Sequence, residues 1–215
     1  DMYKRKPWDN VVMHGYSTMD RDKPGDSTLL VTTTAQMVEF LRGINPKVEI
    51  FLTATWSRAD LVYNSGNPWS ATPINKMASD FRVGYELAAA VPQGLISVNP
   101  VGEAWTRAMA AGLADPNPYD GIEFDKVNLW ADDHYHASDY GYYLEALIVF
   151  GNVTRIDPRT LGAGECSGFE LGMTVSQVAG LQRVAFEQLA SDKRVNPASK
   201  LRPNAAEAQA CGKMP

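Results

Sequence analysis

Residues 48–53 have the sequence VEIFLT, an apolar run with β-branched side chains that predicts a buried strand. An Asn-Pro turn at residues 45–46 precedes this run, and the polar segment 55–58 follows it. Similar runs at residues 10–13 and 95–98 predict two further strands. All three strands are too short and too apolar to be half exposed, which favours a parallel sheet covered by helices on both faces. The predicted fold class is therefore α/β.

Segments with helical periodicity lie between these strands and after them, and most of them have residues typical of a helix start or end. The predicted helices are residues 28–42 between Ser27 as N-cap and Gly43 as stop, a helix starting at Thr72-Pro73, a helix marked by Trp105, Met109 and Gly112, a helix from Ser138 to a cap at Gly151, and a helix from a Thr174/Gln177 capping box to about Leu189. Ligands of parallel sheets bind at the carboxyl ends of the strands. We therefore expect the loops at His14, Trp56 and Asn99 to share one edge of the sheet, together with the loop of Asp133 and His136.

The composition is that of a globular protein of 215 residues, 45% hydrophobic, with a net charge of −5. No Lys/Arg-rich face is visible, which argues against nucleic-acid binding, and no apolar run is long enough to span a bilayer. We expect residues 1–162 to form one domain and residues 163–215 to add its C-terminal helix and a wrapping tail. Without an initiator Met or a signal peptide, the chain is expected to be a processed or truncated product.

Two cysteines, Cys166 and Cys211, lie in the C-terminal quarter. Both could be buried thiols. A cysteine this close to the end of the chain instead favours a disulfide that fastens the tail, and with it a periplasmic or secreted location.

Residues 129–151, LWADDHYHASDYGYYLEALIVFG, contain the densest group of chemically active side chains. Asp133 and His136 have an Asp-x-x-His spacing, with which one short loop can supply both the base and the orienting carboxylate of a catalytic triad. Two alternatives stay open. The group could be a solvated loop, or His134 and His136 could bind a divalent metal with the two aspartates, provided that a further ligand comes from elsewhere.

Four blocks in this order resemble the bacterial SGNH (GDSL-like) hydrolases over roughly residues 7 to 162. They are WDNVVMHGYS (8–17), TATWSR (53–58), PVGEAW (100–105) and DHYHAS (133–138), the last followed by GYYL (141–144). The resemblance implies a flavodoxin-like three-layer α/β/α sandwich that hydrolyses esters. It also implies that Asp133 orients His136 and that His136 is the general base, with Asp132 and His134 as neighbours.

The nucleophile block of that family, a Gly-Asn-Ser-like or Gly-Asp-Ser-like turn after the first strand, has no counterpart before Trp8. The resemblance therefore implies that the nucleophilic serine lies on a preceding βα unit of at least roughly 30 residues. This unit is expected on a separate fragment, or it was removed by cleavage, or the given sequence of the enzyme is incomplete. Ser17, which also follows a strand, is the other candidate for the nucleophile. The alternative is that Ser17 is an ordinary turn serine. His14 and the amides near Gly15 are candidate oxyanion donors, although a buried, hydrogen-bonded strand-end histidine is an equal reading of His14.

The tryptophans mostly predict core or loop packing, but Trp56 and Trp130 could line an acyl or sugar pocket. The function predicted is a carboxylic-ester hydrolase that uses a Ser-His-Asp acyl-enzyme mechanism on a small-molecule or polymeric ester. It needs no metal or organic cofactor, because imidazole, carboxylate and amides supply the chemistry. The alternative is a non-catalytic carbohydrate- or ligand-binding module on the same scaffold.

Overall fold

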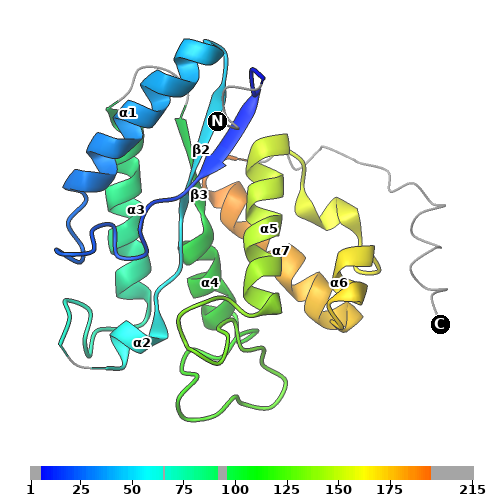
Figure 1. The fold of residues 1–215 in the computed structure, drawn as a ribbon. Helices are drawn as coiled ribbons and strands as arrows, with labels where there is room; N and C mark the ends of the chain where they lie inside the picture. Colours follow the sequence, from blue (N-terminus) through cyan, green and yellow to red (C-terminus); the bar gives the residue numbers. More distant parts are fainter. Residues whose placement is uncertain (1–5, 65, 92–95, 195–215) are drawn as a thin grey trace. The chain divides into compact units, whose positions relative to one another are not determined.

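A computed structural model of the chain describes residues 6–64, 66–91 and 96–194. Its elements are β1 (Asn10–Met13), α1 (Thr28–Ile44), β2 (Glu49–Ala54), α2 (Ala59–Val62), α3 (Asn75–Ala90), β3 (Ile96–Pro100), α4 (Val101–Ala110), α5 (Asp139–Thr154), the 3-10 helix η2 (Pro158–Leu161), α6 (Cys166–Glu170) and α7 (Val175–Ser191) (Figure 1). The chain divides into two compact units. One comprises residues up to 57 and 61–102, and the other comprises residues 58–60 and those from 103 onward.

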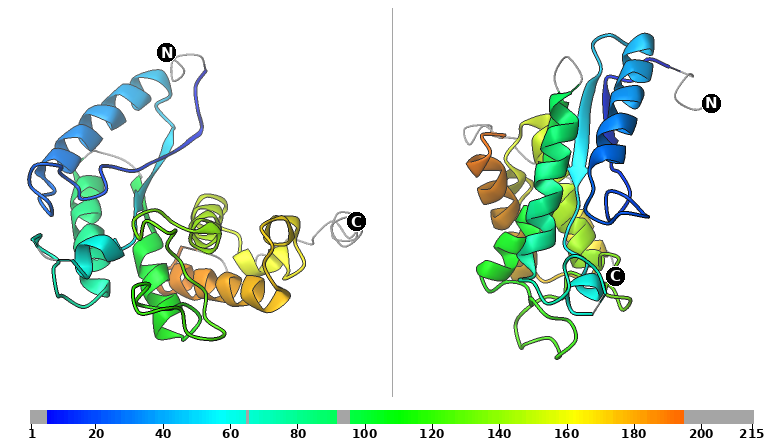
Figure 2. Two further views of the ribbon diagram at one scale, coloured as in Figure 1. Left: turned by 60° about the horizontal axis from the view of Figure 1, so that its bottom comes forward. Right: turned by 90° about the vertical axis from the view of Figure 1, so that its left-hand side faces the viewer.

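The first unit is built on a parallel sheet in which β2 lies between β1 and β3. Parallel neighbours in chain order need crossover connections, and right-handed crossovers that step in one direction place both helices on the same face. The helices α1 and α3 pack against each other, and the right panel of Figure 2 views them from the face that they cover. The predicted α/β sandwich on a parallel sheet is confirmed.

The core of this unit follows from strand alternation. Ile50, Leu52 and Ala54 project from one face of β2 and are at most 3% exposed, and Phe51 on the opposite face is 1% exposed. β1 differs from the prediction, because its residues alternate between exposed and half-buried and Val12 is 44% exposed. Among the described strands β1 pairs only with β2, so as an edge strand it is less covered than a central one.

The described residues of the second unit form helices joined by loops. α7 packs against α5 and η2, and the predicted inward residues of α7 are buried: Val178, Leu181, Ala185 and Leu189. The predicted capping box is confirmed: the Thr174 side chain accepts from the Gln177 amide while the Gln177 side chain accepts from the Thr174 amide. Residues 195–215, predicted as a wrapping tail, lie outside the described residues.

Three predicted helix ends are wrong. α1 continues past Gly43 to Ile44. Its N-cap Ser27 makes no side-chain capping bond, and the Asp26 carboxylate accepts from the Thr28 amide at the start of the helix. α3 begins at Asn75 rather than at Thr72-Pro73.

α5 likewise continues past Gly151 to Thr154. Arg155 takes the left-handed C-cap position with φ 62°, and its guanidinium donates to Asn152 Oδ1 at 2.9 Å. A side-chain bond to the last turn thus holds a residue where glycine is the usual choice.

No helix among the described residues has the length and apolarity needed to cross a membrane.

Candidate active site

The loop that carries Asp133 and His136 is a tight chain reversal in the second unit. The Ala131 amide donates to the His136 carbonyl at 2.8 Å, and a β-bridge joins Trp130 to Ala137. The turn closes where the His134 amide donates to the Ala131 carbonyl, with His134 in the left-handed region at φ 57°. The reversal returns the chain beside itself, so residues three positions apart can meet.

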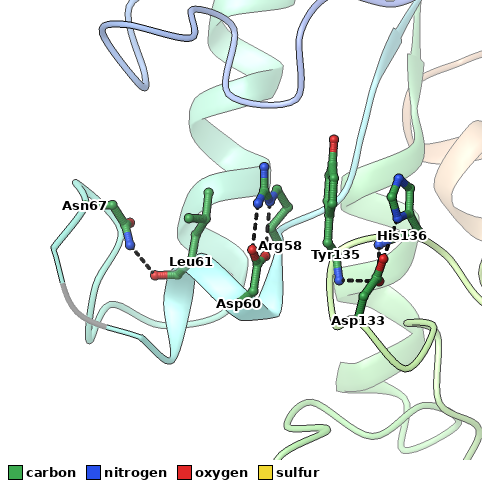
Figure 3. A network of polar contacts seen from close by, with 7 residues as sticks. All are labelled: Arg58, Asp60, Leu61, Asn67, Asp133, Tyr135 and His136. Carbon is green, nitrogen blue, oxygen red and sulfur yellow. Dashed lines mark hydrogen bonds and ion pairs between the residues drawn. The ribbon is translucent and has the colours of Figure 1, made fainter.

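Asp133 and His136 meet in this turn. Asp133 Oδ2 lies 2.5 Å from His136 Nδ1, and Asp133 Oδ1 accepts from the amides of Tyr135 at 3.0 Å and His136 at 2.8 Å (Figure 3). The hydrogen bond from the His136 side chain, followed by those from the two amides, lowers the pKa of Asp133 to about 2. An ionised carboxylate only accepts, so Nδ1 carries the proton and the lone pair of the neutral ring lies on Nε2.

The His136 ring is accessible, with its side chain 57% exposed. An imidazole whose Nδ1 is held by a carboxylate and whose Nε2 is left as an acceptor can remove a proton from a hydroxyl group. The pair therefore has the geometry of a general base with its orienting carboxylate.

Tyr135 and Arg58 form a stack beside this pair, which the sequence did not indicate. The Tyr135 and His136 ring centroids are 4.1 Å apart, and Arg58 Cζ lies 3.8 Å from the Tyr135 centroid. Two groups so close to one ring centroid must lie on opposite faces, and Figure 3 shows Tyr135 between them.

Asp60 fixes the outer end of this stack. Asp60 accepts from Arg58 Nε at 3.0 Å and from Nη2 at 2.6 Å, and its backbone amide donates to the His134 carbonyl at 3.2 Å. The side chains of Arg58 and Asp60 are only 17% and 24% exposed. Residues 58–60 are thereby fastened both to the turn and to the stacked ring. No short-range sequence pattern could reveal a stack between segments this far apart in the chain.

Ser138 immediately precedes α5 and follows the candidate pair by two positions. As predicted, it is the N-cap: its hydroxyl accepts from the Gly141 amide at 3.3 Å and donates to the Asn128 carbonyl at 2.6 Å. Both functions hold this hydroxyl in place, so Ser138 is a structural serine.

The other predicted site residues have different surroundings. Ser17, His14, Gly15 and Trp56 belong to the first unit, whose parallel strands bring the segments after β1 and β2 to one end of the sheet, as predicted. The predicted loop at Asn99 is wrong, because Asn99 lies inside β3 and is buried. The loop of Asp133 and His136 belongs to the second unit, so its place beside these segments stays a prediction. His14 is exposed rather than buried, and its Nδ1 lies 3.0 Å from the Gly15 carbonyl oxygen. The Gly15 amide donates to Tyr85 Oη at 2.8 Å, so this amide is not free to bind an oxyanion.

Trp130 is an interior residue in this structure. It is 1% exposed and packs edge to face against Trp105 with a centroid distance of 5.4 Å. Trp130 therefore packs in the core, and the prediction that it lines an acyl or sugar pocket is wrong. Trp56 is half-buried.

Two further predictions concern a metal site and a disulfide. Within residues 6–64, 66–91 and 96–194, no group of three or more His, Cys, Asp or Glu is placed to hold a metal ion. Cys166 begins α6, and its predicted partner Cys211 lies outside the described residues, so the disulfide stays a prediction.

Comparisons with known proteins bear on the fold. No family model and no curated protein matches the sequence. The chain is similar to the crystal structure of a DUF4886 family protein from Bacteroides uniformis, with 17% identity and a TM-score of 0.64, over 92% of this chain and 68% of that one. At this identity the likeness supports the α/β fold alone, and the SGNH resemblance and any activity stay predictions.

Proposed function

We propose that this chain supplies the His-Asp half of a serine-dependent carboxylic-ester hydrolase. The observation that supports it best is the 2.5 Å contact between Asp133 Oδ2 and His136 Nδ1, in a turn that leaves the imidazole accessible. The lowered pKa of Asp133 keeps its carboxylate ionised and able to stabilise an imidazolium.

In the proposed reaction, His136 Nε2 removes the proton of a serine hydroxyl as its oxygen attacks the ester carbonyl. The imidazolium then gives this proton to the leaving alcohol, and an acyl-enzyme remains. A water molecule, deprotonated in turn by His136, hydrolyses the acyl-enzyme and restores the serine. Asp133 holds the ring throughout and stays ionised.

The serine is the part of the proposal that rests on resemblance. Its two candidates are Ser17 and a serine on a separate N-terminal fragment. Ser138 is not a candidate, because its hydroxyl caps α5.

Hydrolysis of 4-nitrophenyl acetate by the purified protein tests the proposal, with His136→Ala expected to lower kcat/KM by about a thousandfold or more. A fluorophosphonate probe followed by peptide mass spectrometry then identifies the serine, on this chain or on a co-purifying fragment. Full activity of His136→Ala, or labelling that does not depend on His136, would contradict the assignment.

The proposal includes a periplasmic or secreted location and a Cys166–Cys211 disulfide. Alkylation of the unfolded protein should modify neither cysteine before reduction and both after it. Modification of both without reductant would remove this part of the proposal and leave the hydrolase mechanism untouched.

A further inference from the structure

Residues 119–125, here called the aromatic loop, expose apolar side chains that a globular protein normally covers. Phe124 is 93% exposed, Tyr119 46% and Ile122 40%. Three large apolar side chains exposed within seven residues are typical of a binding surface rather than of scattered surface residues.

The aromatic loop is held in place by contacts between the two segments that flank it. A β-bridge between Ala114 and Val127 closes its base. Inside this base Asp115 is 2% exposed, and its carboxylate accepts from the amides of Asn117 at 3.0 Å and Glu123 at 2.9 Å. A buried carboxylate that binds both sides of the loop gives it a defined shape, so the exposed side chains are presented by an ordered structure.

The aromatic loop is continuous with the candidate active site, within the second unit. The rings of Tyr119 and His134 are in contact, with centroids 4.2 Å apart and a 54° interplanar angle. His134 belongs to the same turn as Asp133 and His136. A molecule bound on Tyr119 would therefore reach the turn that presents His136.

Charge restricts what can bind there. Asp120, Glu123 and Asp125 are all exposed, while the only cation between residues 114 and 127 is Lys126, which pairs with Glu123 at 2.6 Å. This surface repels anionic lipid headgroups and anionic polymers. Asp120 already accepts from the Asn117 side chain, and Glu123 from Lys126, but each carboxylate has further acceptor positions that need donors. A polyester, which offers no donors, would desolvate these positions without satisfying them.

We propose that the aromatic loop binds an uncharged polysaccharide and that, if the proposed function holds, the ester attacked at His136 is an O-acyl group on that polysaccharide. Sugar rings have apolar C–H faces for Phe124, Tyr119 and Ile122, and their hydroxyl groups donate to the neighbouring carboxylates. A polysaccharide would therefore contact both the apolar side chains and the carboxylates of the aromatic loop.

Affinity gel electrophoresis with soluble galactomannan, arabinoxylan or mixed-linkage β-glucan measures this binding without any need for turnover. We expect retention by at least one of these polymers. Phe124→Ala should weaken it about fivefold or more. Phe169→Ala, which removes a 52% exposed ring on α6, is the matched control and should leave retention unchanged.

Alginate and vesicles of phosphatidylcholine with phosphatidylglycerol serve as anionic probes, and neither should bind. Retention by none of the three neutral polymers, equal weakening by both variants, or preferential binding to an anionic probe would overturn the proposal. An active esterase without retention refutes the polysaccharide site alone. Retention without any hydrolysis, in a preparation that also contains the N-terminal fragment, refutes the proposed reaction and supports a carbohydrate-binding module.

Discussion

The carboxylate of Asp133 binds His136 twice, at the backbone amide through Oδ1 at 2.8 Å and at ring Nδ1 through Oδ2 at 2.5 Å. One oxygen closes the turn and the other orients the imidazole. The same residue therefore has a structural task and a proposed chemical task, and the two can be separated by substitution.

Asp133→Asn should separate them. Asparagine keeps a carbonyl oxygen for the amides, but its NH₂ group cannot accept from Nδ1–H, so His136 should change tautomer and lose its base at Nε2. We expect kcat for 4-nitrophenyl acetate to fall about a thousandfold or more, with little change in the free energy of unfolding. Asp132→Asn, at the exposed neighbouring position, is the control and should retain activity. Equal activity of the two variants would contradict the role given to Asp133.

The pKa of Asp133 leads to a second prediction. Because the folded state lowers it from 3.8 to about 2, the contribution of this carboxylate to stability is fully present above pH 3.8 and is lost as the pH falls through about 2. A ¹³C NMR titration of the carboxyl carbon should show a midpoint near 2. In His136→Ala the midpoint should rise, since the largest cause of the shift is gone. An ordinary midpoint in the unsubstituted protein would refute the contact.

Tyr135 should act as a positioning residue for His136. Its ring covers one face of the imidazole at a 4.1 Å centroid distance and is itself covered by Arg58. Tyr135→Phe keeps the stack and should retain kcat within about threefold, whereas Tyr135→Leu should lower kcat about tenfold with a smaller effect on KM. The ¹H shift of His136 Cε1–H should lose its ring-current contribution in Tyr135→Leu alone. An unchanged shift in that variant would show that the stack does not form in solution.

Local patterns in the sequence predicted much of the fold. β2 was placed within one residue of its observed bounds, and Thr174 and Ser138 were identified as caps, because strand alternation and capping depend on neighbouring residues. The Asp133 and His136 contact was also predicted, since both residues lie in one turn.

The remaining features depend on contacts between distant segments. The stack joins Arg58 to Tyr135 in the turn of His136, and the Gly15 amide donates to Tyr85 of α3. The helix ends at Gly43 and Gly151 were predicted wrongly because a glycine ends a helix by taking the left-handed conformation, and neither of these two has a positive φ. After α5, Arg155 takes that conformation instead, and its side chain bonds to Asn152 in the last turn.

The helix caps give a stability test with a built-in control. Thr174→Ala removes a hydroxyl that accepts from the Gln177 amide and should lower the free energy of unfolding by about 1 kcal/mol in urea denaturation. Ser27→Ala should change it by less than about 0.5 kcal/mol, because the Ser27 side chain makes no capping bond. A larger loss at Ser27 than at Thr174 would contradict both capping assignments.

Gly141 should be the glycine that the candidate site tolerates least. A Cβ added there would overlap the Leu129 carbonyl oxygen and come within 2.5 Å of Trp105 Cζ2, so either α5 or the arm of the turn that begins at Leu129 must move. Gly141→Ala should therefore lower the free energy of unfolding by about 3 kcal/mol and reduce any hydrolysis with it. At Gly43 in α1 an added Cβ meets nothing within 4 Å, and Gly43→Ala should stabilise by about 0.5 kcal/mol through helix propensity. Chemical denaturation of both variants measures the difference, and a Gly141→Ala protein as stable as the unsubstituted one would show that the turn and α5 are not packed as closely as this structure has them.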